Sequence, residues 1–162
     1  MELLGIDDSK KLSKKKREKI YAEIVNRSLA VGLGMIAVDK INNMGIATAN
    51  RLAMKQALDN LPITPDFVLI DSIAIDGLGY TNMSVPRGDG HCYSIAAASI
   101  IAKVTRDRLM VKLSREYPEY GLEEHKGYGT SQHKNAVSKY GYSDIHRTNF
   151  RFHQDRAEGN II

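Results

Sequence analysis

The chain of 162 residues lacks the features that mark several classes of protein. Its one cysteine, Cys92, excludes an intrachain disulfide and a cysteine-rich zinc site. No apolar run approaches the length needed to cross a bilayer. Asp7, Asp8 and the lysines that follow them come too early for the apolar segment of a cleavable signal peptide. We therefore expect a protein of the reducing cytoplasm with no membrane partner.

Several catalytic signatures are also missing from the sequence. The segment Gly88–His91 (GDGH) lacks the GKS/T ending of a phosphate-binding loop. The histidines form no HExxH pattern, so a zinc protease is unsupported. There is no GxSxG elbow and Cys92 has no evident partner, so neither serine nor cysteine nucleophiles are indicated.

The length instead allows one domain with a substantial core. The formal net charge of +4 permits a polyanionic partner without requiring one. Basic residues crowd the segment from Lys10 to Lys19, and Lys10 and Lys11 face either solvent or nucleic-acid phosphate. Such a charge run is usually a solvated helix face and less often a surface that tracks phosphates.

Hydrophobic periodicity predicts helices that alternate with strands, which is the pattern of an α/β protein. Ser13 and Thr130 are candidate caps for the first and last helices, and Gly141 is expected to stop the last one. The predicted helices span residues 13–30, 46–61, 93–117 and 130–140, and the predicted strands span 31–38, 67–70 and a short stretch that ends near residue 89.

Two aspartates follow predicted strands. Asp71 stops the apolar run Phe67–Ile70, and Asp89 ends the next strand. Carboxylates at the carboxyl ends of strands face the edge where α/β folds bind ligands. Two of them on neighbouring strands suit Mg²⁺ or Mn²⁺, which prefer oxygen ligands. The alternative interpretation is that each aspartate is an ordinary loop or capping residue.

Two basic and aromatic turns are candidate contacts for nucleic acid. The first is HKGYGT, with His125, Lys126 and Tyr128, where the tyrosine suits stacking on a sugar or bonding to a 2′-hydroxyl. The second is HRTNF, in which Arg147 suits a phosphate. Alternatively, Tyr128 packs on the adjacent helix and the second cluster only closes the domain.

Five segments, taken in order, resemble the ribonuclease HII family: DSKKLS, VLIDS, RGDGHCYSIAAASIIAKVTRDRLM, YPEYGLEEHKGYGT and HRTNF. The resemblance implies a ribonuclease H-like α/β fold, with a mixed sheet flanked by helices. It also implies an endoribonuclease that cleaves the RNA strand of RNA–DNA hybrids and single ribonucleotides embedded in DNA. The implied products carry a 5′-phosphate and a 3′-hydroxyl, and the implied cofactor is Mn²⁺ or Mg²⁺ held by a set of carboxylates.

Transferred by motif, the resemblance makes Asp71 and Asp89 the last two catalytic, metal-binding carboxylates. It makes Tyr128 the tyrosine that packs against the deoxyribose beside the scissile junction. The family's first two carboxylates form an Asp-Glu pair in a motif like DEAGRG, which this sequence lacks. Asp7 and Asp8 are not that pair, because the Ser-Lys-Lys-Leu that follows places them in the loop before the first helix.

From the missing motif we expect an amino-terminally truncated ribonuclease HII domain over residues 1–150, without its first two strands, and a tail over 151–162. Two alternatives to the enzyme remain open: a nucleic-acid-binding remnant without catalysis, and an inactive fragment. We expect a monomer whose partners are RNA–DNA hybrids and duplex DNA that contains ribonucleotides.

Overall fold

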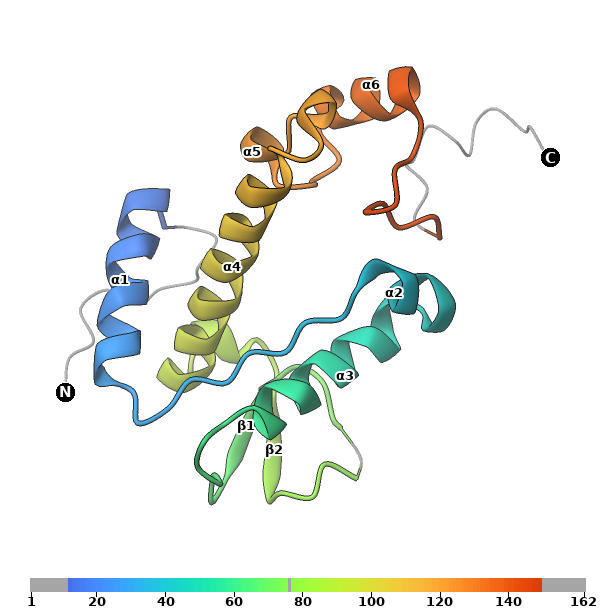
Figure 1. Ribbon diagram of the computed structural model, residues 1–162. Coiled ribbons are helices and arrows are strands. Elements are labelled where there is room, and N and C mark those ends of the chain that lie inside the picture. The colour runs from blue at the N-terminus through green and yellow to red at the C-terminus, as the bar shows by residue number, and fades with distance from the viewer. Residues whose placement is uncertain (1–11, 76, 150–162) are drawn as a thin grey trace. The chain divides into compact units, whose positions relative to one another are not determined.

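The computed structural model describes residues 12–75 and 77–149, and it has the mixture of helices and strands that the sequence predicts (Figure 1). The helices are α1 (Lys14–Arg27), α2 (Val38–Met44), α3 (Ile46–Asp59), α4 (Tyr93–Leu113), α5 (Leu122–His125) and α6 (Ser131–Tyr140), with short 3-10 turns η1 (Gly88–Gly90) and η2 (Pro118–Tyr120). The strands are β1 (Val68–Asp71) and β2 (Asn82–Val85). The predicted α/β class is confirmed.

The chain forms two compact units, which we describe separately. The first contains residues 1–35 and 53–106, and the second contains residues 36–52 and 107–162. The predicted boundary between a domain and a tail at residue 150 lies outside the described residues. Within the described ranges, no helix combines the length and the apolar character that crossing a membrane requires.

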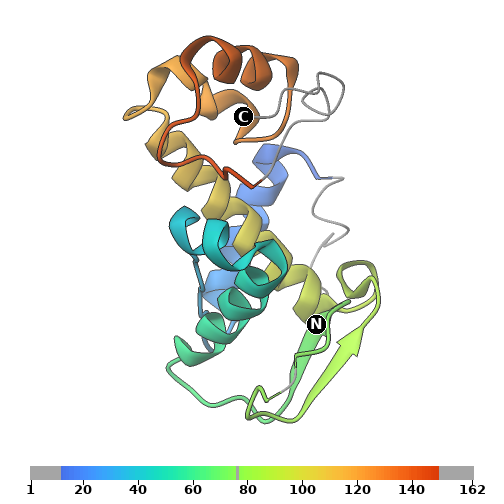
Figure 2. The same ribbon diagram turned by 90° about the vertical axis from the view of Figure 1, so that its right-hand side faces the viewer.

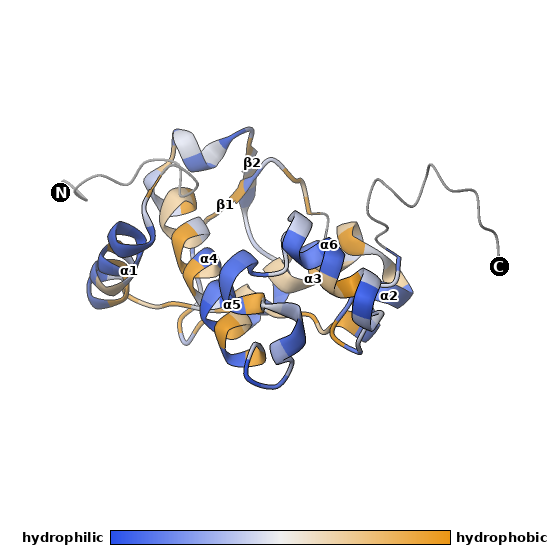
Figure 3. Ribbon diagram, turned by 90° about the horizontal axis from the view of Figure 1, so that it is seen from above, coloured by the Kyte–Doolittle hydropathy of each residue, from blue (hydrophilic) through white to orange (hydrophobic). Residues whose placement is uncertain are grey.

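Helix α1 begins where its capping residue predicts. The Ser13 hydroxyl accepts a hydrogen bond from the Lys16 N–H at 3.3 Å, which satisfies one of the free donors of the first turn. The helix ends at Arg27, three residues before the predicted end at about residue 30. Its lysine-rich remainder is hydrophilic (Figure 3), so its stability depends on one apolar face.

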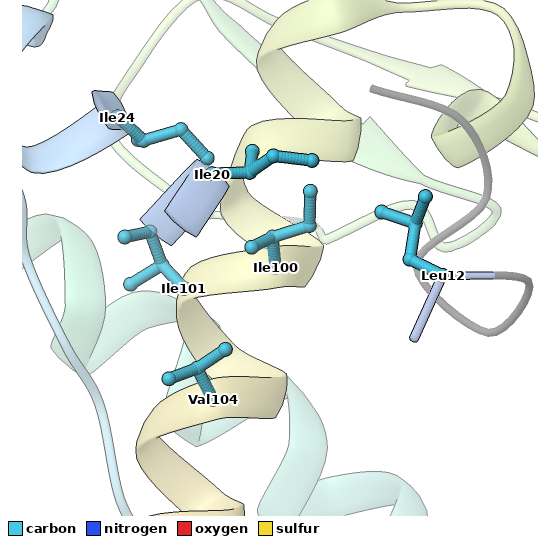
Figure 4. Close-up of a cluster of buried hydrophobic side chains, with 6 residues drawn as sticks. All are labelled: Leu12, Ile20, Ile24, Ile100, Ile101 and Val104. Carbon is cyan, nitrogen blue, oxygen red and sulfur yellow. The ribbon is translucent and has the colours of Figure 1, made fainter. Parts of the chain in front are cut away.

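That face packs against α4 to form the main core of the first unit (Figure 4). Ile100 is completely buried at the centre of this cluster. Burying each such side chain stabilises the fold by about 1.5–3 kcal/mol. The cluster consists of Leu12, Ile20, Ile24, Ile100, Ile101 and Val104.

The described sheet is a parallel pair of strands that lie side by side in both ribbon views (Figures 1 and 2). Val68 and Ile70 are buried on one face, against Met54 and Leu58 of α3. The register pairs Asp71 with Val85, so both strands end at the same edge. The predicted strand over residues 67–70 is therefore confirmed, shifted by one residue, and its carboxyl end carries the predicted aspartate.

The predicted strand over residues 31–38 is wrong. Residues 29–37 form no regular element, and α2 begins at Val38. Hydrogen bonds to side chains of α3 replace those of a strand ladder: the Met35 N–H donates to Gln56 Oε1 at 2.9 Å, and Asn60 Nδ2 donates to the Leu33 carbonyl at 2.7 Å. The segment thus packs along a helix instead of pairing in a sheet.

The two glycines that interrupt this segment explain why it lies against α3. A Cβ on Gly32 would lie 2.0 Å from the carbonyl oxygen of Ala57, and one on Gly34 would lie 1.8 Å from that of Ala53. Only glycine permits so close an approach of two backbones. What appears in the sequence to be a strand with two glycines is therefore a glycine-based contact with a helix.

The second unit has its own small core. Tyr120, Leu122 and Val137 are buried together, with side chains from the end of α4 packed around them. Helix α6 has the predicted boundaries, because Thr130 Oγ1 accepts from the His133 N–H and Gly141 ends the helix with a φ of 79°. The long helix α4 ends at Leu113, four residues before the predicted end.

We predict that Gly34→Ala destabilises the protein. The added methyl group meets the Ala53 carbonyl, so the segment must move away from α3 at a cost of about 1–3 kcal/mol. Urea unfolding measures this change in free energy. Gly90→Ala is the matched control, because a Cβ there has no atom within 4 Å. Equal stability of the two variants would contradict the proposed contact.

Candidate active site

Asp71, the last residue of β1, is hydrogen-bonded to the turn that follows β2. Its Oδ1 accepts from the Gly88 N–H at 2.8 Å and from the Ser72 hydroxyl at 3.0 Å. The Ser72 hydroxyl in turn accepts from the Arg87 N–H at 3.1 Å, and the Ser72 N–H donates to the Val85 carbonyl. These bonds connect the ends of both strands to one turn.

The turn itself requires an unusual backbone. Ser72 and Arg87 both have positive φ, 59° and 53°, a conformation that few residues other than glycine adopt. Gly88 is buried, and a Cβ there would lie 2.4 Å from the Ile95 side chain of α4. The turn is thus held between the sheet end and the first residues of α4, and strain of this kind is concentrated at functional sites.

Asp89 follows Gly88 within η1 and is half-buried. Because the Gly88 N–H contacts Asp71 directly, the two predicted carboxylates belong to the same corner of the first unit. Among residues 12–75 and 77–149, no group of three or more His, Cys, Asp or Glu side chains has the arrangement of a metal site. The described part of the chain therefore offers two carboxylates, a donor set that suits Mg²⁺ or Mn²⁺ when water and substrate phosphate supply further oxygens.

Tyr128 lies in the second unit, between α5 and α6. Its N–H donates to the His125 carbonyl at 2.9 Å, and its carbonyl accepts from the Thr130 N–H at 2.8 Å. The side chain is 53% exposed. A fixed backbone with an exposed ring is the arrangement that a stacking contact requires.

His125 and Lys126, which were predicted to contact substrate, are both buried. The Lys126 ammonium donates to the Glu123 carbonyl, and the residue has a φ of 53° at the end of α5. His125 bonds to the Tyr120 carbonyl and to the Gly127 N–H. In the structure these side chains shape the turn that carries Tyr128, and their contact with nucleic acid stays a prediction.

The remaining predicted contacts are less defined. Arg147 is half-buried in the segment after α6. Its neighbours Thr148 and Asn149 donate to the side-chain and backbone oxygens of Asn42, so α2 holds this segment in the second unit. Lys10 and Lys11 lie outside the described residues.

Comparison with known proteins decides the family. Residues 1–153 match the family described as Ribonuclease HII. The chain belongs to the ribonuclease HII family. Ribonuclease HII of Caldicellulosiruptor bescii is 48% identical over 146 residues, which cover 90% of this chain and 71% of the relative. Ribonuclease HII of Bacillus licheniformis is 47% identical over 149 residues, which cover 92% of this chain and 58% of the relative.

Solved structures show the same fold. The ribonuclease H2 of Pyrococcus horikoshii matches with a TM-score of 0.75 and 24% identity, covering 96% of this chain and 83% of that one. The ribonuclease HII of Archaeoglobus fulgidus, solved in a complex with PCNA, matches with a TM-score of 0.68 and 19% identity, covering 93% and 80%. The implied ribonuclease H-like fold is therefore confirmed. The family is one of enzymes, ribonucleases that act on nucleic acids containing RNA.

Sequence reasoning missed a cluster of three buried histidines in this ribonuclease HII chain. The rings of His125 and His133 stack with centroids 4.5 Å apart, and the His133 and His146 rings follow at 5.4 Å. The three residues are 7%, 5% and 8% exposed. The segments HKGYGT, α6 and HRTNF each contribute one histidine to the cluster. The spacing of these histidines along the sequence does not indicate that they lie together.

Burial lowers the pKa of both His133 and His146, because a charged imidazole is poorly solvated there. The hydrogen bond donated to the Tyr128 carbonyl opposes the shift at His133, and the negative charge of Asp144 opposes it at His146. The ionisable groups that face this pair are His125, Tyr120, Tyr142 and Asp144.

We predict that the protein loses stability in mild acid through these two histidines. Their folded pKa values lie below the unfolded value of 6.5, so the unfolded chain binds more protons as the pH falls below about 6.5. Stability is then complete above that pH, declines toward the folded pKa values, and stops declining below them. Urea unfolding between about pH 8 and pH 5 measures the change. A profile that is equally steep after both histidines are replaced by asparagine would contradict the assignment.

We also predict that Asp71→Ala and Asp71→Asn differ in stability. Alanine leaves the Gly88 N–H without its acceptor, at a cost of about 1–3 kcal/mol, whereas the asparagine oxygen still accepts both bonds. Urea unfolding of the two variants measures the difference. Asp59→Ala, at the exposed end of α3, is the control for removal of a charge. Equal losses in the two Asp71 variants would show that the turn does not depend on this acceptor.

Proposed function

We propose that this protein is an endoribonuclease that cleaves the RNA strand of RNA–DNA hybrids and single ribonucleotides embedded in duplex DNA. The observation that carries the proposal is the bond from the Gly88 N–H to Asp71 Oδ1, which joins the sheet end to the turn bearing Asp89 in a chain of the ribonuclease HII family. Strand ends of this kind are where α/β folds bind ligands.

Asp71 and Asp89 would hold Mn²⁺ or Mg²⁺, which would supply positive charge for phosphodiester hydrolysis. Both hydrogen bonds to Asp71 fall on Oδ1. The Gly88 and Ser72 donors keep the carboxylate in one orientation. Water would attack the phosphorus and the 3′-oxygen would leave, which gives a 5′-phosphate and a 3′-hydroxyl.

Tyr128 would bind the sugar next to the scissile bond. Its exposed ring can pack on a deoxyribose, while its backbone is held by hydrogen bonds to His125 and Thr130. We assign the phosphates on either side to basic residues, with Arg147 the half-buried candidate. As the family resemblance and the single cysteine suggest, we also propose that the protein works in the cytoplasm as a monomer.

One observation favours a second function, nucleic-acid binding without cleavage. The described residues bring together two carboxylates, whereas the family resemblance implies a larger set. The exposed Tyr128 and the net charge of +4 serve binding in either case. The two functions differ in the effect of a divalent cation: the endoribonuclease cleaves the ribonucleotide-containing strand when the cation is added, whereas the binding protein leaves it intact.

We predict metal-dependent cleavage of a DNA duplex that contains one ribonucleotide, and its loss in Asp71→Asn and Asp89→Asn. Each variant removes the charge that attracts the cation but keeps the size of the side chain. Gel analysis of the labelled strand, with Mn²⁺, Mg²⁺ or a chelator, measures the cleavage. Asp59→Asn is the matched control for loss of a charge, and a melting curve confirms that each variant is folded.

Binding of this duplex without cleavage would overturn the endoribonuclease proposal and support the second function. Failure to bind it at all would overturn both proposals.

A further inference from the structure

The three buried histidines of the second unit form a hydrogen-bonded chain that ends at the backbone of Tyr128. His133 Nε2 lies 3.1 Å from His146 Nε2, and His133 Nδ1 lies 3.1 Å from the Tyr128 carbonyl oxygen. At the other end, the Ser143 N–H and hydroxyl contact His146 Nδ1 at 3.1 Å and 2.8 Å. A chain of this kind transmits position only when each bond has one donor and one acceptor.

Backbone groups determine which nitrogen carries each proton. The Ser143 N–H is always a donor, so His146 Nδ1 is an acceptor and the proton of the neutral ring lies on Nε2. That proton is donated to His133 Nε2, so the proton of His133 lies on Nδ1. His133 Nδ1–H then donates to the Tyr128 carbonyl, which completes a chain that runs in one direction.

His125 is determined in the same way and holds the other side of the turn. The Gly127 N–H donates to His125 Nδ1 at 3.1 Å, so His125 carries its proton on Nε2 and donates it to the Tyr120 carbonyl at 2.8 Å. The His125 carbonyl accepts the Tyr128 N–H. Both backbone polar groups of Tyr128 are thus bonded to residues of the histidine cluster.

We propose that His133 and His146 are positioning residues for Tyr128, acting through the proton chain from Ser143 to the Tyr128 carbonyl. The inference rests on the proposed role of Tyr128 in binding substrate. The tyrosine side chain extends into solvent from a backbone whose carbonyl is held by His133 Nδ1–H and by the Thr130 N–H. A fixed ring loses less conformational entropy when a sugar packs on it.

The chain also requires the rings of His133 and His146 to be neutral. An added proton on His133 Nε2 would face the His146 Nε2–H at 3.1 Å and break the bond between the rings, whereas an added proton on His146 Nδ1 would face the Ser143 N–H at 3.1 Å and break the bond to the backbone. The groups that face the pair are His125, Tyr120, Tyr142 and Asp144, and only Asp144 carries a negative charge. We therefore expect the turn to loosen in mild acid at the position that carries Tyr128.

Long-range ¹⁵N–¹H correlation spectra of residues 1–162 test the proton positions without any substrate. At about pH 7.5 we expect neutral rings, with the proton on Nδ1 of His133 and on Nε2 of His146 and His125. A His133 ring that carries its proton on Nε2, or one that is charged at this pH, would overturn the chain.

Binding to a fluorescent DNA duplex with one ribonucleotide tests the positioning role. His133→Asn keeps an amide near the Nδ1 position and should rescue the bond to Tyr128, whereas His133→Gln places its amide near Nε2 and loses that bond. We expect His133→Gln to weaken binding by about 2- to 10-fold, and His133→Asn to weaken it less. Ser138→Ala, exposed on the same helix, is the control.

A double-mutant cycle separates positioning from general damage to the fold. Once Tyr128 is alanine, His133→Gln should weaken binding no further, because the group that it positions is absent. Additive losses would indicate a merely structural role and overturn the proposal. Ser143→Ala is the milder variant if His133→Gln fails to fold, and we expect a smaller loss that also depends on Tyr128.

The failures of the two proposals are distinguishable. If Tyr128→Ala binds the duplex normally, the assigned substrate role of Tyr128 is wrong and the positioning role falls with it, although the proton positions stand on the spectra. If Tyr128→Ala weakens binding but His133→Gln does not, only the positioning role is wrong.

Discussion

The candidate active site depends on one hydrogen bond, from the Gly88 N–H to the Asp71 carboxylate. This bond brings the carboxyl end of β1 to the turn that follows its parallel neighbour. Ser72 and Arg87 adopt positive φ on either side of it, and buried Gly88 leaves no room for a side chain against α4. Asp89 lies in the same turn, directly after Gly88, so the positions of both aspartates depend on a single backbone contact.

Tyr128 is held by a different physical principle. No regular element extends through its turn, so its backbone is held by imidazole rings and neighbouring peptide groups. These rings are buried, and backbone donors determine the position of each proton. Low dielectric surroundings strengthen such bonds and also make an unpaired group costly. The turn is therefore well defined only while the rings remain neutral.

The family assignment and the geometry support each other at different levels. The family model and relatives that share 47–48% identity establish that the chain belongs to the ribonuclease HII family, and similarity to solved structures establishes the fold. The matches cover 71% and 58% of those relatives. The bond between Asp71 and the Gly88 turn in the first unit, and the exposed ring of Tyr128 in the second, each connect the family to a specific chemical proposal.

Local signals in the sequence determined much of the fold. Ser13 and Thr130 cap their helices as expected, because a side-chain oxygen three residues before a free N–H is a local arrangement. The apolar run before Asp71 forms the strand, shifted by one residue, because a short continuous apolar run is a signal contained within a few positions. The motifs themselves were sufficient to place the chain in its family.

Only the tertiary structure decided the rest. The sequence of residues 31–38 predicts a strand, yet Gly32 and Gly34 place the segment against α3, a partner about 20 to 25 residues away. Two further contacts join residues that no sequence periodicity relates. One is the bond between Asp71 and Gly88, and the other is the cluster of His125, His133 and His146. Local propensity describes the structure that a segment can form alone. These contacts form instead because two distant segments become buried against each other, so that apolar surface and polar groups of both leave water together.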